Sequence, residues 1–346
     1  MNGTVPFTSP LNSTVSATLP PSAVYSLEQK TMFFLNTWFL APEIIFGCSG
    51  NVLNLMVLLH KTMRSRTNMI FAAMAVSDLA FLILHIPYIF FFAGPLVISG
   101  FLRLNHTTIT AMINWSSAAS IWLMTYATLE RVQVIRSPFG ANTRSAVSMR
   151  FVLTIVLICV TAFFVTGIHF VREWPIMKNR TMLKSVLFQI NAGLIVIGPL
   201  ILCTLLNWKL VQALKMNNRC WNSIGSDDNA HNQSLIQSRV KTERKVTMVV
   251  CVIISCFVVF NLPGAILFIY REIAGVDSRK DIMFALAQTI CNTMTITGKV
   301  LNFVLFCLTS EHFRKLLRER CTRCAQFPRR SSSRSQRTTT IALETY

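Results

Sequence analysis

Long apolar stretches alternate with short polar connections along most of the chain. Seven stretches are long enough to cross roughly 30 Å of hydrocarbon as α-helices, namely 33–59, 68–93, 107–129, 151–171, 185–208, 246–270 and 282–308. The third is the least apolar, since it holds Asn114, Ser116, Ser117 and Ser120. Kinks are expected where prolines interrupt a stretch, at Pro42, Pro87, Pro199 and Pro263. The pattern predicts an all-α membrane protein built as a bundle of seven transmembrane helices.

Composition supports a membrane protein and argues against a nucleic-acid-binding one. Of the 346 residues, 52% are hydrophobic and only 14% are charged, which is little charge for a soluble domain. The net charge of +19 would suit nucleic-acid binding. A nucleic-acid-binding domain, however, would not separate its basic residues by long apolar runs. We therefore expect membrane lipid as a partner and no nucleic acid.

The basic residues also predict an orientation. Most of the 33 Lys and Arg residues lie in the tail and in the connections after the first, third and fifth spans. Basic connections stay on the cytoplasmic side, so the N-terminus is expected outside the cell in a multi-pass plasma-membrane protein. Glycosylation sequons would then face outward at Asn2, Asn12, Asn105 and Asn179.

The chain divides into four predicted parts. An extracellular tail (1–31) precedes the transmembrane domain (32–308), a short amphipathic helix (309–320) and a disordered cytoplasmic tail (321–346). Cys321 and Cys324 follow the amphipathic segment and are candidates for palmitoylation. As a zinc half-site, this pair lacks a second pair of ligands. Neither a metal site nor an extracellular disulfide is predicted.

Two opposite charges, Asp78 and Lys299, lie within apolar spans. Each costs about 2.5–3.5 kcal/mol at the centre of a membrane helix, so each is expected to face a partner, a cavity or an ion. Lys299 lies three residues before Asn302, which places both on one helix face.

Further charges lie where the third and sixth spans meet the predicted cytoplasm. Glu130 and Arg131 end the third span, and Glu243 begins the sixth. If these ends adjoin, Arg131 can pair with both acids and form a latch that opens when the sixth helix moves outward. The alternative is that these are solvated charges at the membrane edge.

Taken together, the motifs resemble those of the rhodopsin-like (class A) G-protein-coupled receptors. The resemblance rests on Gly50-Asn51, Ser77-Asp78-Leu79, Glu130-Arg131-Val132 in place of Asp-Arg-Tyr, Pro199, Phe257 with Pro263, Asn302 to Phe306, and Phe313-Arg314 in helix eight. It also aligns Ile121 with the isoleucine that packs against the family's proline and phenylalanine. It implies a receptor that is no enzyme and needs no cofactor. A heterotrimeric G protein would dock at Arg131, Pro138, Phe139 and Glu243.

Several positions depart from the family pattern. His106 stands where a bridged cysteine is usual, and Asn261 stands where a tryptophan switch is usual. Asn207 and Phe306 replace two tyrosines. An activation step that uses those hydroxyl groups cannot work identically in this chain.

The resemblance gives the charges in the spans a sharper interpretation. Asp78, Ser120 and Asn302 map onto the family's sodium pocket, and the ammonium of Lys299 would replace the ion and bias the bundle between states. Alternatively, Lys299 snorkels toward the inner surface. Retinal is disfavoured, because the retinal lysine maps to Ile296.

The ligand is less constrained by sequence than the fold is. Ile113 occupies the position of the amine-binding aspartate, which disfavours a monoamine. Short segments around Leu206-Asn207 and Val300 to Leu308 are similar to invertebrate FMRFamide-type receptors and suggest a neuropeptide. The alternatives are a chemosensory receptor for a small molecule and, in another class, a transporter or channel, although the repeated halves typical of many transporters are not evident.

The tail carries candidate phosphorylation sites for receptor kinases and subsequent arrestin binding. They are Ser331, Ser332, Ser333, Ser335, Thr338, Thr339 and Thr340. The neighbouring arginines could also hold the tail against anionic lipid.

Overall fold

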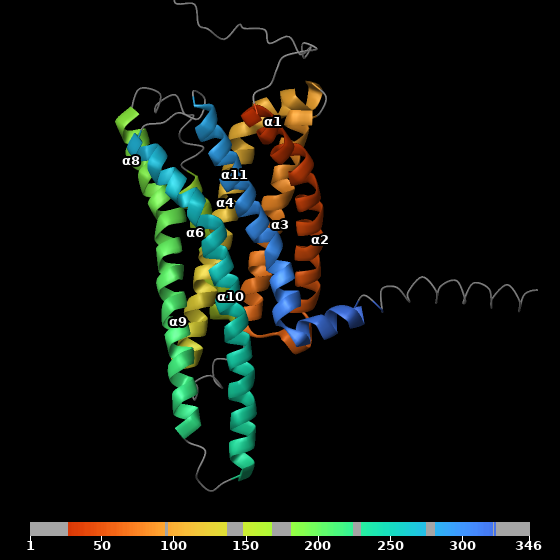
Figure 1. Cartoon of the computed structure of the whole chain (residues 1–346), viewed down its shortest axis with the longest axis vertical. Helices are drawn as coiled ribbons and strands as arrows, with labels where there is room; N and C mark the ends of the chain where they lie inside the picture. The colour runs from red at the N-terminus through yellow and green to blue at the C-terminus, as the bar shows by residue number, and fades with distance from the viewer. Residues whose placement is uncertain are drawn as a thin grey trace, which may run out of the picture.

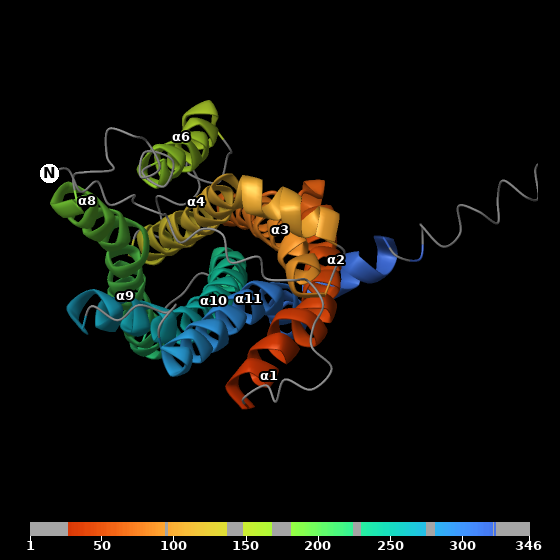
Figure 2. The same ribbon diagram turned by 90° about the horizontal axis from the view of Figure 1, so that it is seen from above.

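A computed structural model describes residues 27–93, 96–136, 148–167, 181–223, 230–274, 281–320 and 322. Within these ranges all regular elements are helical, so the all-α prediction is confirmed. Long helices stand side by side in Figure 1, and Figure 2 shows the same bundle from above.

The helices correspond to the seven predicted spans. The first comprises α1 (Leu27–Phe34), η1 (Leu35–Phe39) and α2 (Leu40–Leu58), and the short η2 (Lys61–Met63) follows it. The second, third and fourth are α3 (Arg66–Ala93), α4 (Leu96–Arg136) and α6 (Met149–Thr166). The fifth comprises α8 (Thr181–Ala192), η4 (Gly193–Ile197) and α9 (Gly198–Ser223). The last two are α10 (Ala230–Ala274) and α11 (Ile282–Thr309).

Helix α4 is less apolar than the other spans because of where it lies. In the described part of the chain, six helical spans are long and apolar enough to cross a membrane, and α4 is not among them. It packs against α3, α6, α9 and α10, and Figure 2 shows it between α6 and α10. Ser116 and Ser120 are buried in these contacts. Polar side chains are tolerated there because they face other helices rather than lipid.

Three helices extend more than ten residues beyond one end of their predicted spans. Helix α4 begins at Leu96 rather than at 107, α9 ends at Ser223 rather than at 208, and α10 begins at Ala230 rather than at 246. An apolar stretch marks only the part of a helix that faces hydrocarbon, whereas the backbone hydrogen bonds can continue past it. Asn105, expected in an outer connection, therefore lies within α4.

The prolines are accommodated in two ways. Pro87 and Pro263 lie inside α3 and α10, which continue through them. Pro42 and Pro199 each follow a π-helical turn, η1 and η4. A proline removes the donor for the carbonyl four residues earlier, and in both cases that carbonyl belongs to the π turn. The wider turn absorbs the missing hydrogen bond.

Small residues let α2 approach α11 closely. A Cβ atom added at Gly50 would lie 2.9 Å from Phe303, and one added at Gly47 would lie 2.8 Å from both Leu82 and Val300. Larger residues at either position would push the helices apart. This close approach fixes α11 beside α2, on the side of the bundle where the buried charges meet.

A final helix over 311–320 turns away from the lower end of α11 in Figure 1. Its buried Phe313 stacks on Phe306 of α11, with ring centroids 5.5 Å apart. Arg314 donates to the carbonyls of Cys307 and Leu308 at 2.9 and 3.0 Å, which satisfies the end of α11.

Candidate functional site

Asp78 of α3 is the centre of a buried polar cluster. Asp78 is 0% exposed to solvent. Its carboxylate accepts three hydrogen bonds from side chains of two other helices. Lys299 Nζ and Ser120 Oγ each lie 2.7 Å from Oδ1, and Asn302 Nδ2 lies 3.1 Å from Oδ2. A buried carboxylate is tolerated only when paired and hydrogen-bonded in this way. The cluster joins α3 to both α4 and α11.

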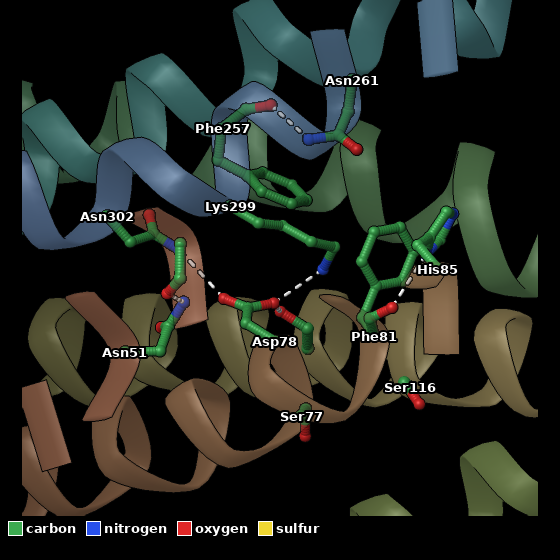
Figure 3. Close-up of polar contacts among 12 residues, drawn as sticks. Asn51, Ser77, Asp78, Phe81, His85, Ser116, Phe257, Asn261, Lys299 and Asn302 are labelled. Atoms are coloured by element: carbon green, nitrogen blue, oxygen red, sulfur yellow. Dashed lines mark hydrogen bonds and ion pairs between the residues drawn. The ribbon is translucent and has the colours of Figure 1, made fainter. Parts of the chain in front are cut away.

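Lys299 points into the bundle and not toward the inner surface. Figure 3 shows its side chain extending from α11 to Asp78. The residue is 7% exposed, and Nζ lies 4.6 Å from the centre of the Phe81 ring. The aromatic face adds a second favourable contact for the ammonium group. In this structure Lys299 is paired with Asp78, and the snorkelling alternative is wrong.

The occupied oxygens limit what else the site can hold. The Lys299 ammonium already supplies the positive charge that the Asp78 carboxylate requires. Among the described residues, no group of three or more His, Cys, Asp or Glu is placed to bind a metal ion. A free cation at Asp78 would first have to displace the lysine. The arrangement can link helices and respond to their movement, and it presents no activated nucleophile.

The other predicted core residues are buried to different degrees. Asn51 is buried in α2 and donates to the carbonyl of Gly47 at 2.9 Å. Ile121 and Pro199 are buried as well, whereas Phe257 is half-buried. Asn261 donates to the carbonyl of Phe257 at 2.8 Å, within the helix that Pro263 interrupts (Figure 3). The Asn261 amide is thus hydrogen-bonded within its own helix.

Near the C-terminal end of α4, Glu130 and Arg131 both contact the start of α3. Arg66 Nη1 lies 3.3 Å from Glu130 Oε1. Arg131 Nε donates to Thr67 Oγ1 at 2.7 Å. Both residues of the motif are buried, at 6% and 5% exposure. They are therefore not the solvated edge charges of the alternative interpretation.

Phe306 replaces a tyrosine of the family with a purely apolar contact. It is buried between Phe71 of α3 and Phe313, with ring centroids 5.2 and 5.5 Å away. Asn207, at the other replaced tyrosine, donates to Ser255 Oγ of α10 at 3.0 Å. The two positions therefore make separate contacts in this structure.

Three residues that make contacts at or near this site were not predicted from the sequence. Arg66 belongs to the basic connection after the first predicted span, and its charge alone does not indicate a partner. Glu43 lies within the first span, and its Oε1 accepts from Thr297 of α11 at 2.5 Å. An acid in an apolar stretch was as visible a signal as Asp78. Phe81, by contrast, had no sequence signal, since an aromatic residue in a membrane helix is ordinary.

Other predicted residues lie outside the described part of the chain. The backbone of Glu243 belongs to α10, but its side chain is not described, so the latch is untested across to that helix. The remaining ones are Asn2, Asn12, Pro138, Phe139, Asn179, Cys321, Cys324, Ser331, Ser332, Ser333, Ser335, Thr338, Thr339 and Thr340.

Comparison with known proteins identifies the family. A predicted G-protein coupled receptor of Caenorhabditis elegans, F59B2.13, is 29% identical over 309 residues, covering 79% of this chain and 70% of the relative. The galanin-like G-protein coupled receptor npr-9 of the same organism is 25% identical and covers 84% and 73%. The human thyrotropin-releasing hormone receptor is 23% identical and covers 92% and 85%. The model of the seven-transmembrane receptors of the rhodopsin family matches residues 50–309, and the chain belongs to that family.

Proposed function

We propose that this receptor binds an extracellular peptide and activates a heterotrimeric G protein by outward movement of α10, its sixth transmembrane helix. The proposed coupling rests on the burial and hydrogen bonding of Arg131. Its guanidinium is buried at the predicted cytoplasmic end of α4 and held by Thr67. A buried, hydrogen-bonded arginine can be released as a strong donor when neighbouring helices separate.

The peptide ligand is supported by the relatives. One of them is named as galanin-like and others as receptors for thyrotropin-releasing hormone, and both names refer to peptides. The resemblance to FMRFamide-type receptors points to the same class and remains a prediction. Ile113, at the amine-binding position of the family, is consistent with a ligand that is not a monoamine.

Within the core, the Lys299 ammonium acts as a tethered cation in place of a free sodium ion. Support comes from the two hydrogen bonds to Asp78 Oδ1, from Lys299 and from Ser120, and from Asn302 on the other oxygen. These contacts connect α3, α4 and α11, so a change in their relative positions must alter the ion pair. The pair thereby biases the bundle between its inactive and active states.

The predicted cytoplasmic end forms the coupling surface. Glu130, Arg131, Pro138, Phe139 and Glu243 would contact or control the G protein. Asn302 and Phe306 would transmit the core movement along α11. After activation, receptor kinases would phosphorylate the tail and arrestin would bind it.

Screening pools of amidated peptides on the expressed receptor, with a promiscuous G protein as readout, tests the proposal. We expect at least one peptide to raise the response, and Arg131→Ala to abolish it while surface binding of that peptide is retained. A response to volatile or metabolite pools and to no peptide would favour a chemosensory receptor. A ligand-dependent current in cells without G proteins would instead indicate a channel.

A further inference from the structure

The first two residues of α3 contact the two consecutive charged residues near the end of α4. Arg66 Nη1 lies 3.3 Å from Glu130 Oε1, and Thr67 Oγ1 accepts from Arg131 Nε at 2.7 Å. Although Glu130 and Arg131 are consecutive, their side chains reach different residues of α3 in this structure. The start of α3 thus holds the acid and the base by separate groups.

The position of Arg66 is fixed by more than this ion pair. Its guanidinium carbon lies 5.3 Å from the centre of the Phe151 ring, which is 4% exposed. Phe151 is itself placed at the start of α6, where Ser148 caps the helix by accepting from its backbone N–H at 3.3 Å. Three helices, α3, α4 and α6, therefore meet at Arg66. A guanidinium that stacks on a ring and pairs with a carboxylate retains little freedom.

The pair differs from an ordinary surface salt bridge, because its acid is buried. The side chain of Glu130 is 7% exposed and that of Arg66 is 21% exposed. A buried carboxylate that loses its cation must find another, since leaving it unpaired is costly. Along the chain the nearest cation is Arg131, the residue that the proposed coupling depends on.

We propose that Arg66 is a positioning residue of the coupling site: it holds the Glu130 carboxylate toward α3 and thereby keeps it from Arg131. The inference rests on the proposed G-protein coupling and adds a residue that the family motif does not include. Without Arg66, Glu130 pairs with Arg131 and competes with the G protein for its guanidinium. The receptor then couples less well.

The test measures ligand-free GTPγS binding by a panel of purified G proteins, per receptor in reconstituted membranes. Arg66→Gln should lower the exchange rate about three- to five-fold, the range of one partly exposed, charge-assisted pair. In the Glu130→Gln background, Arg66→Gln should have no further effect, because the carboxylate that Arg66 restrains is absent.

Two matched variants serve as controls for charge and for folding. Arg64→Gln removes the same charge from an exposed position two residues before α3 and should leave exchange unchanged. Arg66→Lys keeps the charge but loses the planar fork, and it serves as the milder variant if Arg66→Gln is poorly folded; a drop of about two-fold is expected.

The role of Arg66 would be overturned if Arg66→Gln lowered the exchange rate equally in the unmutated and the Glu130→Gln backgrounds. It would also be overturned if Arg66→Gln caused no loss although the unmutated receptor promotes exchange well. Either result would leave the proposed function intact. No exchange by the unmutated receptor or by Glu130→Gln with any G protein would overturn the proposed coupling, and the role of Arg66 with it.

Discussion

At the scale of single residues, the buried charges of Asp78 and Lys299 depend on each other. Their attraction and the donors from Ser120 and Asn302 offset a large cost of desolvation. Such a pair need not add much net stability when intact. If one charge is removed, the other is left unpaired in a site from which water is largely excluded. Loss of one partner should therefore cost much more stability than the intact pair contributes, and this difference can be measured.

Asp78→Asn and Lys299→Met should each lower the free energy of unfolding by about 3–5 kcal/mol, because each leaves one unpaired buried charge. The double variant should be more stable than the sum of the two losses predicts, by about 1–3 kcal/mol. Thermal unfolding of the purified receptor and basal signalling both report the coupling. Independent, additive losses with no rescue in the double variant would refute the pairing.

A second prediction at this scale concerns sodium. Replacing Lys299 by Ser removes the tethered ammonium and leaves oxygens of Asp78, Ser120 and Asn302 around the vacated position. NaCl should then raise the unfolding temperature of Lys299→Ser by about 2 °C or more over choline chloride at equal ionic strength, and the unmutated receptor should show no difference. Adding Ser120→Ala should reduce the gain. Stabilisation of the unmutated receptor by sodium would contradict the tethered cation.

At the scale of elements, the helix over 311–320 is attached to the bundle by few but well-buried contacts. Phe313 is 0% exposed and packs on Phe306 and Phe303, while Arg314 satisfies carbonyls at the end of α11. The orientation of this helix therefore depends on the buried Phe313 and Leu316 and on the hydrogen-bonded arginine.

Phe313→Ala should detach this helix, because removal of a buried phenylalanine side chain typically costs about 3–5 kcal/mol. Amide hydrogen exchange over 311–320 should accelerate strongly, with little change in α3 or α4. Lys315→Ala, at an exposed position of the same helix, is the control and should exchange as the unmutated protein does. Unchanged protection in Phe313→Ala would show that another contact holds the helix.

The elements also show how far sequence reasoning reaches. Apolar length predicted the seven spans, because hydropathy is a local property of a chain. The spacing of Lys299 and Asn302 placed both on one helix face, whereas the resemblance to the receptor family brought Asp78 to them. The partner of Glu130 was missed, since Arg66 lies 64 residues earlier and no local pattern links the two. The predicted ends of α4, α9 and α10 were wrong, because these helices continue past the apolar stretch. Hydropathy marks the apolar residues of a helix and carries no information about backbone hydrogen bonds beyond them.

At the scale of the whole molecule, the two ends of the bundle differ in chemistry. Arg66, Glu130, Arg131 and the helix over 311–320 share one end, together with η2 (Lys61–Met63). His106 and Tyr88 meet toward the other end, with ring centroids 6.1 Å apart. The excess of basic connections near Arg131 predicts that this end faces the cytoplasm.

That orientation can be tested with sequons on opposite ends of the chain. With the N-terminus outside, Asn2→Gln and Asn12→Gln should each increase the electrophoretic mobility of the receptor from cells, and glycosidase should abolish the difference. Asn232→Gln is the matched control, since its sequon begins in α10 on the predicted cytoplasmic side. An N-terminal epitope should also be labelled on intact cells. A mobility change with Asn232→Gln alone would reverse the orientation, and Arg131 could then not contact a G protein.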